Sequence, residues 1–214
     1  MNNNYLLIIA LFGLLVGCAT ETVPATNIYT LSPRWSKQWS NKHETQQRKQ
    51  KTQHQTVKNT GHIVLKLAPV NATRLYNNTS IIYINTRYSR NSYAYSRWSD
   101  APVILLQAVF QQALEKSRLF AAVLPPASIS KARLILESTL FDFSQHITDK
   151  QHSSGVISIR FYLVNNVTRQ VIKSRQFMAT APAPTNNAQG AVMALNKAAT
   201  IISHQLVQWL DQAE

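Results

Sequence analysis

The chain of 214 residues contains one cysteine, Cys18, and has few glycines and few acidic residues. A lone cysteine excludes a disulfide within the chain, so the fold must rest on its hydrophobic core. The five glycines include no two close together after Gly17, which excludes a glycine-rich phosphate-binding loop. Nine Asp and Glu residues stand against 22 Lys and Arg residues, giving a formal net charge of +13. Such an excess usually indicates an anionic partner, which is nucleic acid, an acidic protein or a membrane surface.

The amino-terminal apolar run is too short to cross a membrane. Tyr5 to Gly17 is uncharged and has thirteen residues. As a helix it would rise only about 20 Å, whereas the hydrocarbon core of a bilayer is about 30 Å thick. The segment before it, Met1 to Asn4, has no Lys or Arg, so only the amino terminus supplies the positive charge usual there. The length nevertheless favours the apolar core of a signal peptide over a membrane span.

Cys18 closes the sequence Leu15-Val16-Gly17-Cys18, where a lipoprotein signal peptide places the residue to be acylated. We therefore expect residues 1–17 to be cleaved as a lipoprotein signal peptide. Cys18 would then carry a diacylglycerol and an N-acyl chain, and we expect no other cofactor. Two or three acyl chains hold a protein stably, since each buried methylene contributes about 0.8 kcal/mol. A plain secretory signal followed by a buried cysteine is the alternative.

The residue after the cysteine is Ala19 and not aspartate, which in a Gram-negative cell favours transfer to the outer membrane. The expected location is therefore the periplasmic face of the outer membrane, with the chain held by lipid. Export of this kind makes nucleic acid the least expected of the three anionic partners, and we expect none.

Residues 34–60 form the most basic segment of the chain. They contain seven Lys or Arg residues against Glu44, and their apolar residues are Trp35, Trp39 and Val57. So few apolar side chains cannot offset the entropy of ordering the segment. We interpret it as a polar basic loop or linker that follows the acylated amino terminus and a first strand in residues 18–33. A solvated spacer is favoured over a specific binding arm, although either would be attracted to anionic head groups by about 1 kcal/mol per Lys or Arg.

Residues 61–214 have the pattern of one packed domain. Apolar alternation and turn residues predict strands at 62–70, 80–88, 92–98, 133–143, 157–163 and 171–178. The first of these is expected to end at Pro69. The second and third are expected to form a hairpin that turns through residues 89–91.

Helical spacing of apolar residues predicts two helices. The first follows Ser99 or Asp100, either of which can cap it, and has Pro102 in its first turn. Its apolar stripe consists of Leu106, Val109, Phe110, Ala113 and Leu114. The second runs from about Asn187 to Asp211. Two main helices packed on one face of a largely antiparallel sheet make an α+β fold.

Motifs for catalysis and metal binding are missing. The six histidines include no His-x-x-x-His pair, and no Gly-x-Ser-x-Gly sequence occurs. Asp142, His146, Asp149 and Ser153 lie near one turn, and a catalytic triad there is disfavoured against ordinary polar loop residues. We therefore expect no metal site and no catalytic residues, and the chain is not expected to be an enzyme.

Tyr83 to Trp98 interleaves aromatic residues with Arg87, Arg90 and Arg97. Single-stranded nucleic-acid sites have such a mixture, and so do hot spots of protein interfaces. Aromatic residues also favour strands, where arginine stems cover neighbouring rings. Packing is favoured ahead of an interface, and both are far ahead of nucleic acid.

The sequence Ser96-Arg97-Trp98-Ser99-Asp100-Ala101-Pro102, leading into a helix, resembles the ABC-type transport auxiliary lipoproteins of the PqiC-like group. That family carries a Trp-Ala-Asp or Trp-Ala-Glu step before a helix and a Phe-x-x-Val exit, matched here by Phe120 and Val123. The similarity continues through 28–33, 136–143, 155–177 and the closing Trp209-Leu210. The polar stretch at 34–60 is longer than the family leads us to expect.

The resemblance implies a non-catalytic auxiliary lipoprotein of a transport system that pairs an ABC transporter with MCE-domain proteins and moves lipids, in particular phospholipids, across the envelope. The chain would dock the MCE component at the membrane, and ATP hydrolysis would belong to a partner. Arg97, Trp98 and Asp100 form the step that serves either as core or for docking, and for Trp98 we favour the core. A homo-oligomer stays open. The alternative is a structural or assembly lipoprotein of another outer-membrane or secretion complex, while an envelope hydrolase is disfavoured.

Overall fold

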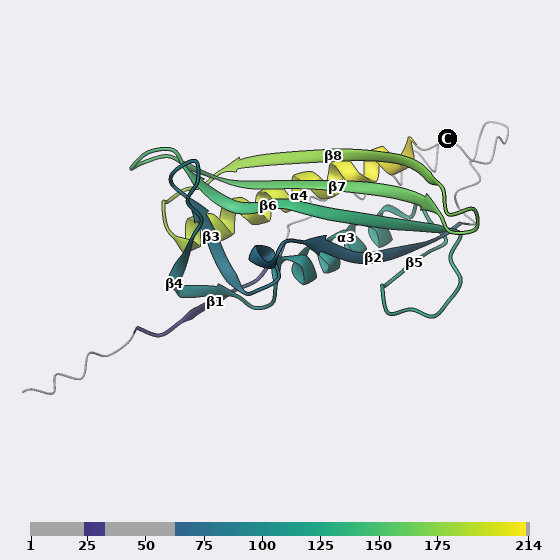
Figure 1. Cartoon of the computed structure of the whole chain (residues 1–214), viewed down its shortest axis with the longest axis horizontal. Coiled ribbons are helices and arrows are strands. Elements are labelled where there is room, and N and C mark those ends of the chain that lie inside the picture. The colour runs from purple at the N-terminus through teal and green to yellow at the C-terminus, as the bar shows by residue number, and fades with distance from the viewer. Residues whose placement is uncertain (1–23, 33–62, 213–214) are drawn as a thin grey trace, which may run out of the picture.

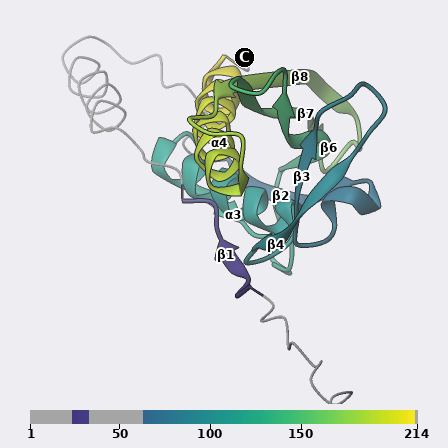
Figure 2. The same ribbon diagram turned by 90° about the vertical axis from the view of Figure 1, so that its left-hand side faces the viewer.

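The computed structural model describes residues 24–32 and 63–212, which form one curved sheet with two helices against one of its faces (Figures 1 and 2). The expected α+β fold is confirmed. The elements of this part are β1 (Asn27–Tyr29), β2 (Val64–Ala72), the short helix η2 (Arg74–Tyr76), β3 (Ser80–Ile84), β4 (Asn91–Trp98), α3 (Pro102–Ser117), β5 (Ala122–Leu124), β6 (Leu134–Ile147), β7 (Ser153–Asn165), β8 (Val171–Pro182) and α4 (Ala188–Asp211). Residues 1–23 and 33–62 lie outside the described residues, so the signal peptide and the basic linker stay predictions.

β6 is the strand from which the sheet is built. Along its whole length it pairs with β7, which is antiparallel, and β7 pairs with the antiparallel β8. On its other side β6 first pairs with β2 and then, near its end, with β3, both parallel. Its neighbour on that side changes between Leu140 and Gln145, and we call this place the fork. The short pairs β1–β4 and β2–β5 are also parallel, so the long pairs are what make the sheet largely antiparallel.

Both helices cover the same face of the sheet. α4 packs against β7 and β8, α3 packs against β2, and the two helices touch each other. The inner row of β7 is buried as its alternation predicts, and it consists of Ile157, Ile159, Phe161 and Leu163. Phe161 meets Phe110 of α3 edge to face, with ring centroids 5.2 Å apart. Each large apolar side chain removed from water in this layer stabilises the fold by about 1.5 to 3 kcal/mol.

The start of α3 differs from the expectation. The stripe of Leu106, Val109, Phe110, Ala113 and Leu114 is buried as predicted. The residue before the helix is Ala101, however, and no side chain caps the first turn. Asp100 Oδ1 accepts instead from the amide of Ala101, at 2.7 Å, and the amide of Ser99 donates to Tyr29 O in β1. Neither side chain bonds the second or third amide of the helix, which is what a cap requires.

Several strand boundaries also differ. β6 continues to Ile147, β7 covers Ser153–Asn165 and β8 continues to Pro182, beyond the predicted ranges 133–143, 157–163 and 171–178. β2 does not end at Pro69 but continues to Ala72, with a register shift between Leu67 and Val70 opposite β6. β5 pairs only with Val64–Lys66, so in the described residues Pro69 has no neighbour on that side, and a missing amide is tolerated at such a site. The hairpin of β3 and β4 is antiparallel as predicted, but β3 ends at Ile84 and the connection covers residues 85–90.

α4 has the bounds that the sequence predicts. Asn187 is its N-cap, and its Oδ1 accepts from the amide of Gly190 at 2.9 Å. Alanines on its inner face allow close approach to β7, where Gly155 lies directly against the helix. A Cβ added at Gly155 would stand 2.7 Å from Leu195 N and 2.8 Å from Ala194 C. Two backbones therefore meet at this glycine with no room for a side chain.

Candidate functional site

The strand-to-helix step at the end of β4 divides into a buried residue and exposed ones. Trp98 is 1% exposed, lies in the core and packs on Phe143 of β6, with ring centroids 5.4 Å apart. Arg97 and Asp100 on either side of it are exposed. A partner that approached this step would contact Arg97 and Asp100, while Trp98 lies in the core beneath the surface.

β1 extends the exposed part of the step. It pairs in parallel with β4, so that Ile28 lies opposite Arg97 and Tyr29 opposite Trp98. Ile28 is 68% exposed. β1, which follows closely after Cys18 in the sequence, therefore places an apolar side chain beside the arginine. We call Ile28, Arg97 and Asp100 the β1–β4 edge. Their association was not predicted, because the sequence does not show which strand β1 joins.

Cys18 lies outside the described residues. In the described ranges, 24–32 and 63–212, neither α3 nor α4 is long and apolar enough to cross a bilayer. The same residues contain no group of three His, Cys, Asp or Glu side chains placed to hold a metal ion.

Some aromatic and arginine residues of β3, β4 and the connection between them lie against one another. The rings of Tyr83 and Tyr93 have centroids 4.7 Å apart. The guanidinium of Arg87 lies 5.6 Å from the ring centroid of Tyr88, and Tyr88 itself is 88% exposed. The contact of Tyr83 with Tyr93 fits the packing interpretation of the segment, whereas the ring of Tyr88 is largely exposed.

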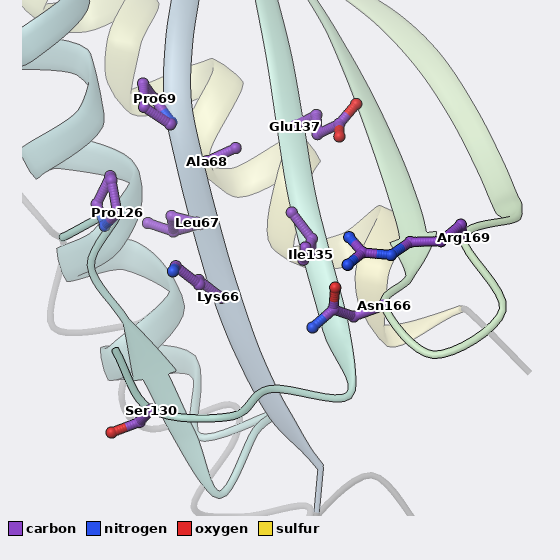
Figure 3. A pocket seen from close by; sticks show the side chains of 10 residues that line it. All are labelled: Lys66, Leu67, Ala68, Pro69, Pro126, Ser130, Ile135, Glu137, Asn166 and Arg169. Carbon is purple, nitrogen blue, oxygen red and sulfur yellow. The ribbon is translucent and has the colours of Figure 1, made fainter. Parts of the chain in front are cut away.

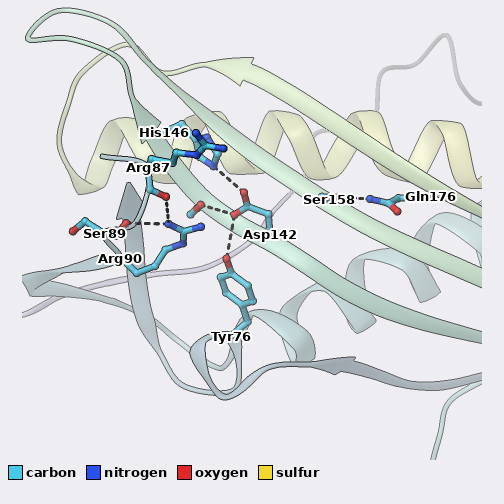
Figure 4. A network of polar contacts seen from close by, with 9 residues as sticks. Tyr76, Arg87, Ser89, Arg90, Asp142, His146, Ser158 and Gln176 are labelled. Carbon is cyan, nitrogen blue, oxygen red and sulfur yellow. Dashed lines mark hydrogen bonds and ion pairs between the residues drawn. The ribbon is translucent and has the colours of Figure 1, made fainter. Parts of the chain in front are cut away.

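A polar cluster around Asp142 occupies the fork in the sheet (Figure 4). Asp142 Oδ1 accepts from Tyr76 Oη at 3.1 Å and from Ser144 Oγ, and its Oδ2 lies 2.8 Å from His146 Nε2. Tyr76 comes from η2, between β2 and β3, whereas the other three residues belong to β6. The Asp142 carboxylate thus connects η2, which follows β2, to β6. We call these four residues the Asp142 cluster.

Three of the four residues of the Asp142 cluster could have been grouped from their spacing in the sequence. Asp142, Ser144 and His146 stand at i, i+2 and i+4, which places them on one face of a strand. The register shifts between Leu140 and Asp142 in the β6–β7 pair, so Phe141 is an extra residue there. Even-numbered residues of β6 are buried up to Leu140, and without the extra residue the next buried position would be Asp142. Because of the shift, the next buried position of this row is Phe143 instead.

The residues considered for a catalytic triad each contact a different partner. Ser153 Oγ accepts from Gln145 Nε2 at 2.8 Å, and Asp149 pairs with His152. His146 pairs with Asp142, so the structure does not assemble Ser153, His146 and Asp149 as a relay. In the Asp142 cluster both Ser144 and His146 face the carboxylate, whereas a nucleophile relay needs the serine to donate to the histidine.

Gln145 forms a second connection that sequence reasoning missed. Its side chain is fully buried. Its Oε1 accepts from Tyr93 Oη, and its Nε2 donates to Ser153 Oγ and to Thr185 O. One amide therefore joins β4, β6, β7 and the turn before α4, and it satisfies its own buried polar atoms.

Burial makes two tyrosines weaker acids than a free tyrosine. Burial, and then the charge of Asp142, raises the pKa of Tyr76 to about 12. Burial, and then the neighbouring Tyr83, raises the pKa of Tyr93 to about 12. Since an unfolded tyrosine ionises near pH 10, both groups favour the folded state fully below about pH 10, and this contribution is lost as the pH rises toward 12.

We therefore expect two phenols to ionise late in an alkaline titration, followed by ultraviolet absorbance of the phenolate. Tyr76→Phe and Tyr93→Phe should each remove one late step. Tyr88→Phe is the control, because Tyr88 is 88% exposed and its loss should leave both late steps in place. A Tyr76→Phe protein that keeps both late steps would contradict the burial of this phenol against Asp142.

Comparisons with known proteins agree with this architecture. The family model described as "ABC-type transport auxiliary lipoprotein component" matches residues 45–207. A crystal structure of a Xanthomonas campestris protein of the DUF330 family has a TM-score of 0.71 at 18% identity, over 86% of this chain and 94% of that chain. A crystal structure of an uncharacterized protein has a TM-score of 0.61 at 12% identity, over 87% of this chain and 99% of that chain. These two similarities show a shared fold. A comparison with curated proteins found no match.

The family match spans well over half of the chain, from the basic segment before β2 to the last turn of α4. It includes the strand-to-helix step at Arg97, Trp98 and Asp100. The chain belongs to the family of ABC-type transport auxiliary lipoprotein components.

Proposed function

We propose that this chain is a lipid-anchored lipoprotein on the periplasmic face of the outer membrane, where it docks the MCE-domain component of an ABC-type lipid transport system. The family match over residues 45–207 is the observation that carries the proposal. The chain acts by binding and not by catalysis, and ATP hydrolysis belongs to the transporter. Acylation of Cys18 after removal of residues 1–17 supplies the anchor.

The position of β1 supports docking close to the membrane. Pro24, the first described residue, follows Cys18 by six residues. Six residues span at most about 20 Å even when fully extended. An acyl anchor on Cys18 would therefore keep the β1–β4 edge near the bilayer, with Ile28 and Arg97 exposed to a partner. Arginine beside an apolar side chain is a composition typical of binding hot spots.

Anchoring is expected to depend on Cys18. Cys18→Ser removes the thiol that accepts the diacylglycerol, so the protein should leave the membrane pellet. Fractionation before and after a high-salt wash measures this, because the wash removes protein held only by its basic charge. The wild-type chain, washed in the same way, is the control and should stay in the pellet. A Cys18→Ser protein that also stays there after the wash contradicts the lipid anchor.

Docking is expected to depend on Arg97. Affinity purification of the acylated chain from detergent-solubilised membranes should recover an MCE-domain protein. Arg97→Glu reverses the charge at the β1–β4 edge and should reduce the recovery about tenfold or more, as expected for loss of a hot-spot residue. Arg175→Glu makes the same charge change on the exposed surface of β8 and is the matched control.

Thermal melts of both variants show whether they are folded. Equal loss of recovery in the two variants would contradict a specific role for the β1–β4 edge. Recovery of a different envelope complex, with no MCE-domain protein, would instead support a structural or assembly lipoprotein.

A further inference from the structure

A pocket of about 420 Å³ opens on the face of the sheet that the helices leave uncovered (Figure 3). Leu65 and Leu67 of β2, and Leu134 and Leu136 of β6, face the helices and are buried. The alternate residues of the same strands therefore point to the other face. We call this hollow the outer-face pocket. Its volume is within the range of small-molecule sites and too small for a folded partner.

The pocket combines an apolar wall with two cations. Ala68, Pro126 and Ile135 supply the apolar part, and Lys66 and Arg169 supply the charges. Lys66 comes from β2, whereas Arg169 comes from the turn between β7 and β8 and extends across the sheet toward Ile135 (Figure 3). Segments far apart in the sequence thus bring two positive charges to one hollow.

Arg169 has a backbone conformation that arginine seldom adopts. Its φ angle is 61°, in the left-handed region that favours glycine. The turn fixes this conformation, because the amide of Arg169 donates to Asn165 O at 2.8 Å, and Asn165 Oδ1 accepts from the amides of Val167 and Thr168. The turn therefore fixes the point from which the Arg169 side chain leaves the backbone.

Both cations of the pocket have N–H groups that can donate hydrogen bonds to a ligand. Within residues 24–32 and 63–212, no hydrogen bond or ion pair engages the guanidinium of Arg169. Lys66 Nζ donates to Ser128 O at 2.7 Å, which holds the loop after β5 and leaves two of its three N–H groups for a ligand. Glu137, also in the lining, reduces the formal charge of the pocket from +2 to +1.

We propose that the outer-face pocket binds a monoanionic phosphate ester, with Arg169 on the phosphate oxygens and Lys66 at the opposite side of the hollow, toward Pro126 (Figure 3). The formal charge of +1 matches a phosphodiester and is poorly matched to a dianion. Glu137 is left to accept from a hydroxyl group of the ligand, and the apolar wall contacts its carbon atoms. The head group of an anionic phospholipid and a soluble phosphate ester share this chemistry.

The test titrates the purified, detergent-solubilised full chain with three probes by calorimetry. The probes are glycerophosphoglycerol, a water-soluble phosphodiester with the head group of an anionic lipid; inorganic phosphate; and uncharged glycerol. Saturable binding of glycerophosphoglycerol, tighter than that of phosphate, is expected and identifies a lipid-type head group. Tighter binding of inorganic phosphate would contradict the preference for a monoanionic ester and would overturn the proposal. Absence of saturable binding by both anions overturns the proposal.

Two glycine variants separate binding from folding. Arg169→Gly removes the guanidinium and suits the left-handed backbone, so it should keep or raise the melting temperature and weaken binding at least tenfold. Arg118→Gly makes the same change at the end of α3, where φ is 55°, and should bind as the wild type does. Unchanged affinity in Arg169→Gly, or equal loss in both variants, overturns the proposal. The assay uses no transport partner, so its failure leaves the docking proposal untouched.

Discussion

Gly155→Val is expected to destabilise the domain by at least about 3 kcal/mol, because it places a branched side chain where two backbones meet. A Cβ at this position would lie 2.7 Å from Leu195 N and 2.8 Å from the Cβ of Ala194. These atoms belong to the body of α4 and cannot move away by a change of rotamer. Overpacking of a core costs 1 to 3 kcal/mol or more, and a clash with backbone atoms belongs at the upper end.

Thermal unfolding measures this effect. For a domain of this size, about 3 kcal/mol corresponds to a melting temperature lowered by roughly 6 to 12 °C. Ser154→Val is the matched control, since it adds the same side chain one residue earlier on β7 and points to the opposite face. Gly155→Ala should fall between the wild type and Gly155→Val. A Gly155→Val protein that melts as the wild type does would show that α4 does not rest on β7 here.

Elements with a strong local pattern were predictable from the sequence. The stripe of α3, the inner row of β7 and the bounds of α4 all agree with the structure. Each depends on residues a few positions apart, so the period of the chain itself reveals which side chains face the core. The α+β class follows once these faces are known, because they have to cover one another.

Features that depend on distant pairing were not predictable. The fork arises because β6 exchanges β2 for β3 as its neighbour, and no local pattern in β6 shows this exchange. The extra residue Phe141 shifts the alternation halfway along β6. The hydrogen bond from the Ser99 amide to Tyr29 O of β1, just before α3, is likewise one that no local pattern shows. Sequence patterns show what a segment prefers, whereas pairing depends on what else is nearby.

The candidate sites divide in the same way. The strand-to-helix step was found through a resemblance that keeps its residues together in sequence, but only the structure separates buried Trp98 from exposed Arg97. The outer-face pocket draws Lys66 and Arg169 from segments about a hundred residues apart, so no motif could indicate it. The Asp142 cluster is intermediate, because three of its four residues are at strand spacing and Tyr76 arrives through the fold.

Trp98→Ala is expected to destabilise the domain by about 3 to 5 kcal/mol, the cost of deleting a large aromatic side chain from a core. Trp98 is 1% exposed, and its ring packs on Phe143 across the sheet. Its backbone amide donates to Thr79 O at 2.7 Å, and Tyr29 of β1 is its register partner. The cavity would therefore open against Phe143 in the core, next to the pairing of β4 with β1.

Trp98→Phe separates volume from polarity at the same site. In the described part of the chain, Trp98 Nε1 is buried without a hydrogen-bond acceptor, and a buried donor left unpaired costs about 1 to 3 kcal/mol. Phenylalanine removes this donor and keeps most of the ring. The loss of stability should therefore be much smaller than with alanine.

Thermal melts and affinity recovery of the MCE-domain protein, made on the same preparation, decide the role of Trp98. With a core role, Trp98→Ala lowers the melting temperature by roughly 6 to 20 °C, and recovery falls because less protein is folded. Trp98→Phe then melts and binds much as the wild type does. An unchanged melt with lost binding in Trp98→Ala would instead make Trp98 a docking residue. In that case the ring would have to leave the core to reach its partner, and the strand-to-helix step would itself be the contact surface.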